Sequence, residues 1–196
     1  MNSIEVIMDN LEARGFMPYF VENLDEAEQL LLDIIPLEAE VGTGGSVTLD
    51  TMDIRRKLFD RGNGVLYGKT YTLATDRVHE LSTQDLTWFL SSANALTIEG
   101  EIVNTDGSCN RIANTVWGAE NIAFIIGINK VVENLQEAFN RIKNIATPLN
   151  VKRLNARRSP DNQITDEEIA RATLILHHPS RGKNVYVILV NESVGY

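Results

Sequence analysis

Residues 42 to 49 place glycines and hydroxyl side chains between an expected strand and an expected helix; they read Gly-Thr-Gly-Gly-Ser-Val-Thr-Leu. Backbone N–H groups in such a turn, with the positive end of the following helix, stabilise a phosphate or a carboxylate. The Lys-Ser/Thr pair of a Walker A loop and the G-x-G-x-x-G dinucleotide pattern are both missing. The alternative is a tight turn that merely requires glycines. We expect an anion site formed by Gly42, Gly44, Gly45, Ser46 and Thr48.

A second polar segment, residues 92 to 114, contains the turn dipeptide Asp106-Gly107 and, shortly after it, Arg111. An aspartate at the carboxyl end of a strand can act as a general base, and an arginine can hold an anion through two hydrogen bonds. The alternative for Asp106 is a carboxylate that caps the turn. Cys109 has no histidine near it in the sequence, which favours an unreactive loop cysteine.

Lys130 directly follows an apolar run and an expected strand, where its amine would meet a substrate phosphate or carboxylate. An ordinary surface lysine is the alternative. We therefore name Asp106 and Lys130 as candidate catalytic residues. No metal site is expected, because the adjacent His177 and His178 would point to opposite faces of a strand. A G-x-S-x-G nucleophile motif is also missing.

Apolar periodicity and turn residues predict the elements that must position these groups. Strands are expected over 17–21, 38–41, 65–67, 95–98, 102–104, 121–127, 174–177 and 184–191. Helices are expected over 3–15, from the Asn23 cap to Pro36, from the glycine turn to residue 60, over 82–91, and from the Asn134 cap to about Pro148. Residues 150–164 are expected to form a mobile loop, and the last two strands a hairpin.

Strands that alternate with helices predict an α/β fold, with an open, mostly parallel mixed sheet covered by helices on both faces. The length of 196 residues suits a single domain, 1–196, to which the helix at about 3–15 is an appendage.

A net charge of −9 argues against nucleic acid and anionic membrane surfaces as partners. The longest apolar runs are strand-sized, so no membrane span is expected, and the first residues lack the basic region of a secretory signal. We expect a cytoplasmic protein. One stretch, residues 138–160, has no acidic residue and carries Arg141, Lys143, Lys152, Arg153, Arg157 and Arg158. It is either a solvated face or the place that receives a small anion or an acidic partner.

Five segments taken together resemble the LUD domain family, the lactate-utilisation proteins of the LutC/YkgG type. They are GTGGSVTL at 42–49, SANALTIEGEIVNTDGSCNRIAN at 92–114, GINKVVENLQEAFNRI at 127–142, TPLNVKRLN at 147–155 and VYVILVNESVGY at 185–196. The resemblance implies a fold like that of the NagB/RpiA/CoA-transferase superfamily. It also implies a bacterial, cytoplasmic setting and a role in oxidising L-lactate to pyruvate beside iron–sulfur subunits.

The resemblance further implies that the glycine turn receives phosphate or coenzyme A. The other family segments map to Asn94, Asp106, Gly107, Asn110, Arg111, Asn129, Lys130, Asn150 and Arg153. Many relatives carry a cysteine cluster before the last strands, whereas residues 156–173 here contain none. We therefore expect no cofactor in this chain, and iron–sulfur clusters only in partner proteins. Relatives tend to have glycine where Cys109 stands, which makes the role of Asp106 less secure.

Three functions remain open at this point. The chain is a non-redox subunit or accessory factor of a lactate-oxidising iron–sulfur complex, a small-anion enzyme of the isomerase or transferase kind, or a metabolite-binding module without catalysis. No glutamate stands in a nucleophile motif, which ranks coenzyme A transfer lower. The sequence leaves open whether the chain forms a homo-oligomer.

Overall fold

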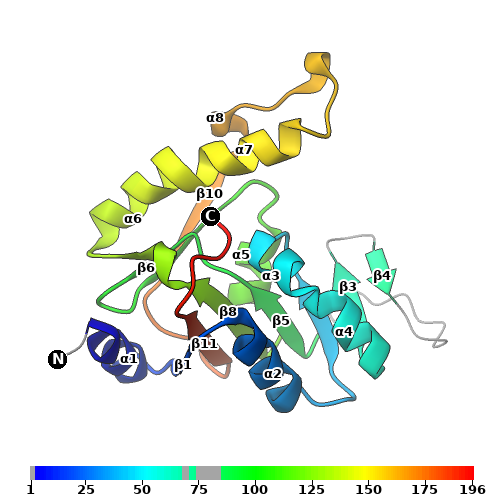
Figure 1. Ribbon diagram of the computed structural model, residues 1–196, viewed down its shortest axis with the longest axis vertical. Coiled ribbons are helices and arrows are strands. Elements are labelled where there is room, and N and C mark those ends of the chain that lie inside the picture. Colours follow the sequence, from blue (N-terminus) through cyan, green and yellow to red (C-terminus); the bar gives the residue numbers. More distant parts are fainter. Residues whose placement is uncertain (1–2, 68–70, 74–84) are drawn as a thin grey trace.

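Two β-sheets organise the chain in the computed structural model, which describes residues 3–67, 71–73 and 85–196 (Figure 1). The larger sheet has the strand order β1-β11-β8-β5-β2-β3-β4, and the smaller has the order β10-β7-β6-β9. The strands are β1 (Met17–Val21), β2 (Glu40–Thr43), β3 (Gly64–Tyr67), β4 (Tyr71–Leu73), β5 (Trp88–Ser91), β6 (Ala95–Thr97), β7 (Ile102–Asp106), β8 (Asn121–Gly127), β9 (Val131–Val132), β10 (Ala172–Leu176) and β11 (Asn184–Val190).

Every described pairing in the larger sheet is parallel except that of β3 with β4. This confirms the predicted α/β class with an open, mostly parallel sheet. The interior strand β8, between β11 and β5, is an apolar run buried on both faces, as expected for a strand inside a parallel sheet. The helices are α1 (Ser3–Ala13), α2 (Leu24–Ile34), α3 (Val47–Met52), α4 (Ile54–Arg61), α5 (Asn110–Val116), α6 (Leu135–Arg141), α7 (Thr147–Asn155) and α8 (Asp166–Ile169).

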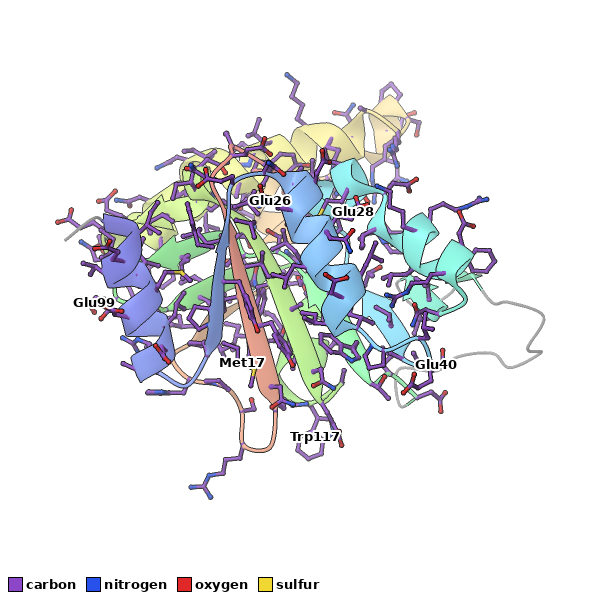
Figure 2. The ribbon with its side chains drawn as sticks, turned by 60° about the horizontal axis from the view of Figure 1, so that its bottom comes forward. Met17, Glu26, Glu28, Glu40, Glu99 and Trp117 are labelled. Carbon is purple, nitrogen blue, oxygen red and sulfur yellow. The ribbon has the colours of Figure 1, made fainter. Side chains whose placement is uncertain are left out.

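Alternate side chains of β8 enter two separate cores. Ala123 and Ile125 pack with α2, α3 and α4 on one face of the larger sheet, and α2 lies in front of that sheet in Figure 2. Phe124 packs on the other face with α1 and the smaller sheet, and Leu11 of α1 is fully buried there. Trp117 is 89% exposed and projects from the end of the molecule away from α7 (Figure 2).

Two helix starts and one turn behave as predicted. The side chains of Asn23 and Asn134 accept hydrogen bonds from the backbone N–H groups three residues later, at the starts of α2 and α6. β6 and β7 form an antiparallel hairpin around Gly100, whose φ is +88°. A side chain at Gly100 would press on the α1 backbone, so glycine is required there on two counts.

The helix predicted over 82–91 is wrong where the structure describes it. Trp88–Ser91 forms β5, which pairs with β2 and β8 and is buried at every position. A short apolar run buried on both faces has the same local pattern as a buried helix segment, and the pairing decides between them. Residues 82–84, which carry the predicted cap, lie outside the described residues.

The helix predicted to end near Pro148 does not end there. A π-helical turn, Ile142–Ala146, joins α6 to α7, and Pro148 lies in the first turn of α7. Pro148 is tolerated there because it directly follows the wider π-helical turn, where its backbone nitrogen need not donate a hydrogen bond within the helix. The loop predicted over 150–164 is therefore wrong in its first part, since α7 extends to Asn155. A short 3-10 turn, Pro160–Asn162, and α8 follow.

The predicted terminal hairpin is also wrong. β10 pairs with β7 in the smaller sheet, whereas β11 inserts between β1 and β8 in the larger one. The turn between them carries the chain from one sheet to the other. Within the described ranges, no helix has the length and apolar character needed to cross a membrane.

Candidate functional site

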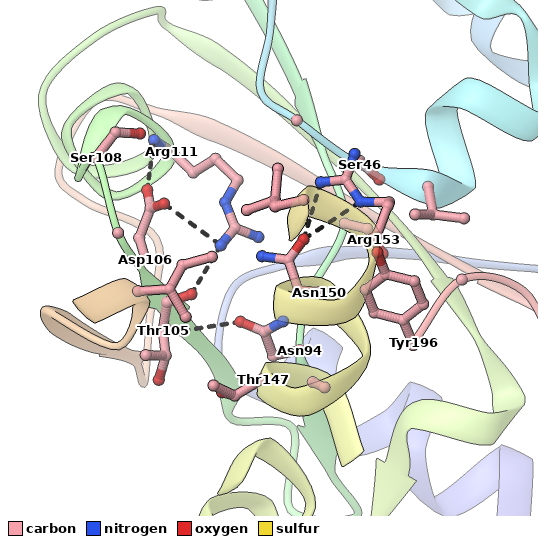
Figure 3. A pocket seen from close by; sticks show the side chains of 18 of the residues that line it. Ser46, Asn94, Thr105, Asp106, Ser108, Arg111, Thr147, Asn150, Arg153 and Tyr196 are labelled. Atoms are coloured by element: carbon pink, nitrogen blue, oxygen red, sulfur yellow. Dashed lines mark hydrogen bonds and ion pairs between the residues drawn. The ribbon is translucent and has the colours of Figure 1, made fainter. Parts of the chain in front are cut away.

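The cavity at the carboxyl edge of the larger sheet has a volume of about 500 Å³. Segments that follow the parallel strands β2, β5, β8 and β11 line it, and the end of β7, α7 and α8 complete its walls (Figure 3). Ligands bind at this edge in open α/β sheets because the loops that follow neighbouring strands converge there.

Lys130 ends a 3-10 turn after β8 and lies in the buried wall of the cavity, where it is only 2% exposed. Its Nζ donates to Thr48 Oγ1 at 3.1 Å and to Ser92 Oγ at 2.8 Å. No ion pair between described residues includes Lys130. Burial and, to a smaller extent, the positive charges of Arg141 and Arg111 together lower the pKa of the Lys130 amine to about 7.

Asp106 and Arg111 form one unit beside the amine. The Asp106 carboxylate accepts from the backbone N–H of Arg111 at 2.9 Å and lies 3.5 Å from its Nη2. Nη2 also donates to the carbonyl of Thr105 at 2.7 Å. Both carboxylate oxygens thus face Arg111 (Figure 3), an arrangement that holds the guanidinium at the cavity wall. The predicted role of Asp106 as a general base remains a prediction.

The glycine turn divides its residues between two tasks. Gly45, Ser46 and Thr48 line the cavity, whereas Gly42 and Gly44 do not. A Cβ at Gly42 would meet Leu86, and one at Gly44 would meet the stem of Arg111, so these two glycines serve packing. The Ser46 hydroxyl accepts from the Leu49 N–H as the cap of α3, a helix of six residues.

The α7 wall supplies an amide and a guanidinium. Arg153 donates through Nε and Nη2 to Asn150 Oδ1, at 3.3 and 2.8 Å. Tyr196 lies against Arg153 (Figure 3). Burial raises the pKa of the Tyr196 hydroxyl, and the positive charge of Arg153 opposes that rise.

Of the remaining predicted residues, Asn94, Gly107 and Asn110 line the cavity and Asn129 does not. The Asn94 side-chain oxygen accepts from the Thr105 N–H at 2.9 Å, which orients its amide in the wall. The Asn129 side chain instead accepts from the Val194 N–H and donates to the Gly195 carbonyl. It fixes the segment that brings Gly195 to the cavity.

The sequence itself shows what kind of protein builds this site. A family model described as LUD domain matches residues 4–190. The chain belongs to the LUD domain family. The family is associated with lactate utilisation. The resemblance inferred from the ordered segments is therefore confirmed.

A solved structure is similar to this LUD domain over most of its length. It is the crystal structure of a DUF162 family protein from Deinococcus radiodurans at 1.70 Å resolution, which covers 96% of each chain with a TM-score of 0.59. At 14% sequence identity the likeness concerns the fold. A comparison with curated proteins gives no match.

Sequence reasoning missed several cavity residues of this LUD domain. Among them are Ser92, Thr105, Thr147, Arg158, Glu168, Arg171 and Tyr196. Ser92, Thr105, Thr147 and Tyr196 lie within segments that the sequence analysis singled out, and Arg158 belongs to the basic stretch, of which Arg153 also reaches the cavity. Arg141 is buried instead, and it donates to the carbonyls of Asn94 and Asn129.

The lining gives the cavity a positive character. Five basic side chains, Arg111, Lys130, Arg153, Arg158 and Arg171, face two acidic ones, Asp106 and Glu168. Across the described part of the chain, no three His, Cys, Asp or Glu side chains gather closely enough to hold a metal ion. The arrangement is chemically suited to receive an anion beside a buried amine.

Proposed function

We propose that this LUD domain serves lactate utilisation by binding a small anionic metabolite, a carboxylate or a phosphate, in the cavity at the carboxyl edge of its larger sheet. The proposal rests above all on one observation. Lys130 is buried in the cavity wall with two hydroxyl partners and no carboxylate partner among the described residues. A buried ammonium group without a counter-ion is costly, and a bound anion would offset that cost.

The neighbouring side chains support the same conclusion. Arg111 and Arg153 are held in the wall by hydrogen bonds, so little conformational entropy is lost when they receive a ligand. A volume of about 500 Å³ lies within the range of small-molecule sites. L-lactate, pyruvate and sugar phosphates all have the required charge and fit within that volume.

Isothermal calorimetry of the purified protein with L-lactate, pyruvate, sugar phosphates and inorganic phosphate tests this proposal. At least one of these anions should bind, and Arg153→Gln should weaken its binding about tenfold or more, because a charge-assisted hydrogen bond contributes about 1.5 to 3 kcal/mol. Lys152→Gln is the matched control: it removes the same charge at the exposed neighbouring position, outside the cavity. Equal weakening by both variants, or no binding of any anion, would contradict the proposal.

We also propose that the domain associates, as a non-redox component, with iron–sulfur proteins of lactate oxidation. Besides the family context, one surface feature favours a protein partner. Ile145 and Leu149, four residues apart on the continuous helical rod from α6 to α7, are 46% and 42% exposed. Large exposed apolar side chains that lie near one another are typical of contact surfaces.

Size-exclusion chromatography with light scattering, on the domain mixed with iron–sulfur subunits produced beside it, tests this association. Leu149→Asp should abolish a complex that Arg153→Gln leaves intact. A complex that survives Leu149→Asp would contradict the assignment of this surface, and the absence of any complex would contradict the association. The same measurement on the domain alone decides whether it forms a homo-oligomer.

A further inference from the structure

We propose that the Lys130 amine is a nucleophile that forms an imine with the carbonyl carbon of a short 2-oxo acid. This inference rests on the proposed anion binding, because the cavity must first hold the carboxylate of the acid. It goes further by assigning a covalent step to one atom, Lys130 Nζ, and by naming the class of compound on which that atom acts.

The hydrogen bonds around Nζ orient its lone pair. Ser92 Oγ donates its own hydrogen to the carbonyl of Ile125 at 2.6 Å, so its oxygen is left to accept from Lys130. Thr48 Oγ1 is the second partner of the amine. A neutral amine has two hydrogens and one lone pair. When both hydrogens bind these two hydroxyls, the lone pair takes the remaining tetrahedral position, on a side chain that lines the cavity.

The surroundings also favour the neutral, nucleophilic form of the amine. Burial and two nearby guanidinium groups bring the pKa of Lys130 to about 7, so a large fraction of the amine is unprotonated near neutral pH. A solvated lysine is almost entirely protonated there. Enzymes that attack carbonyl groups with lysine activate it in this way, by desolvation or by a neighbouring positive charge.

The position of positive charge selects the kind of carbonyl compound. Arg111 lines the cavity and is close enough for its charge to lower the pKa of Lys130. It uses its backbone N–H and Nη2 for Asp106 and Thr105, and no hydrogen bond to another described residue occupies Nη1 or Nε. These groups can therefore bind a carboxylate. In a 2-oxo acid that carboxylate is attached directly to the carbonyl carbon, which matches an arginine beside the amine.

The step is balanced without any other reactant. The nitrogen lone pair forms the C–N bond while the carbonyl π electrons move to oxygen, which gives a carbinolamine. The two hydrogens of the amine then leave with that oxygen as water, and the C=N bond forms. Nothing is oxidised or reduced, and hydrolysis returns the free lysine and the acid.

Reductive trapping tests the proposal on the full chain. The protein is incubated with pyruvate and sodium cyanoborohydride near neutral pH, and the products are analysed by intact mass and by peptide mapping. The expected product carries pyruvic acid less one oxygen atom on Lys130, and it should form at least about tenfold faster there than on an ordinary lysine. L-lactate, which has the carboxylate without the carbonyl, should slow the labelling and give no adduct.

Two controls make the result specific. Lys130→Arg keeps the positive charge and removes the nucleophile, so the adduct should disappear. Lys183 is an internal reference: burial lowers its pKa too, but its Nζ donates to the carbonyls of Gly118 and Ala119 and it does not line the cavity.

Calorimetry with pyruvate, run in parallel, separates the possible failures. Pyruvate that binds without an adduct on Lys130, or labels Lys183 equally fast, would overturn the imine and leave the anion-binding proposal standing. If neither pyruvate nor any other anion binds and no adduct forms, both proposals fail. Labelling of Lys130 that Lys130→Arg abolishes would support them together.

Discussion

Gly44 lies directly against the aliphatic stem of Arg111, and a Cβ built at position 44 would come within 2.4 Å of the Arg111 Cγ. The turn after β2 and the start of α5 approach each other this closely because position 44 has no side chain. Gly44 therefore affects the cavity indirectly, because the absence of a side chain at this position leaves room for Arg111.

Gly44→Ala should displace Arg111 and weaken anion binding at least severalfold. Overpacking of this kind costs about 1 to 3 kcal/mol of stability, which urea denaturation would measure beside calorimetry. Gly45→Ala is the matched control for stability, since a Cβ there meets nothing nearer than the Tyr67 hydroxyl at 4.0 Å. If Gly44→Ala binds anions as the natural chain does, the proposed role of Gly44 is wrong.

The stability of the domain should depend on pH through Lys130. Because the folded-state pKa is about 7 and the ordinary value is 10.5, the unfolded chain binds more protons on this group between those pH values. The contribution of Lys130 to the free energy of unfolding should then rise with pH across that window, by at most about 1.4 kcal/mol per pH unit. Below pH 7 both states are protonated, and the penalty of the buried charge is present in full.

Denaturation of the natural chain and of Lys130→Met at several pH values isolates this contribution. The stability of the natural chain relative to the variant should increase from pH 7 upward. A difference in stability that stays constant with pH, or that falls, would mean that folding does not lower the pKa of the Lys130 amine.

Arg141→Met should raise the pKa of Lys130, because the charge of Arg141 helps to lower it. The pH midpoint of the Lys130 Cε resonance in NMR spectra would report the shift. The same substitution should cost about 1 to 3 kcal/mol of stability, since Arg141 donates to the carbonyls of Asn94 and Asn129. Lys143→Met removes an exposed charge from the same helical rod and should leave both quantities unchanged.

Asn129→Ala should release the segment 194–196 from the cavity. The Asn129 side chain makes two hydrogen bonds to that segment, each worth about 0.5 to 1.5 kcal/mol. Hydrogen–deuterium exchange at Val194 and Gly195 should therefore become faster, and calorimetry should show weaker anion binding. Asn191→Ala cuts only an exposed bond to Glu22, and it should change neither measurement.

The elements that sequence reasoning located are those with strong local signals. The β-branched run of β8 and the asparagine caps of α2 and α6 each specify their own conformation, whatever the rest of the chain does. Trp88–Ser91 has no such signal, because its conformation is decided by pairing with β2 and β8. The helix end predicted near Pro148 was wrong for the opposite reason. The local signal of the proline was strong, but the preceding π-helical turn accommodates it within the helix.

The candidate site follows the same division. Residues next to strand ends, such as Thr48, Asp106 and Lys130, could be named because the carboxyl ends of parallel strands converge. Arg171 precedes β10 and Tyr196 follows β11, so both lie at the cavity only because the chain passes from one sheet to the other between these strands. No local sequence pattern predicts that change. Asn129 was named from its neighbourhood in the sequence, yet its side chain turns toward the residues after β11.

The amine of Lys130 and its two hydroxyl partners come from distant parts of the chain, separated from it by 82 residues at Thr48 and by 38 at Ser92. Contacts over such separations form late, because the entropy of closing long loops must be overcome first. On a ribosome-bound or partly folded chain, position 130 would thus carry an ordinary solvated ammonium group. Any reactivity toward carbonyl compounds would arise only when folding is complete, so the unfinished protein would be protected from modification by the metabolites around it.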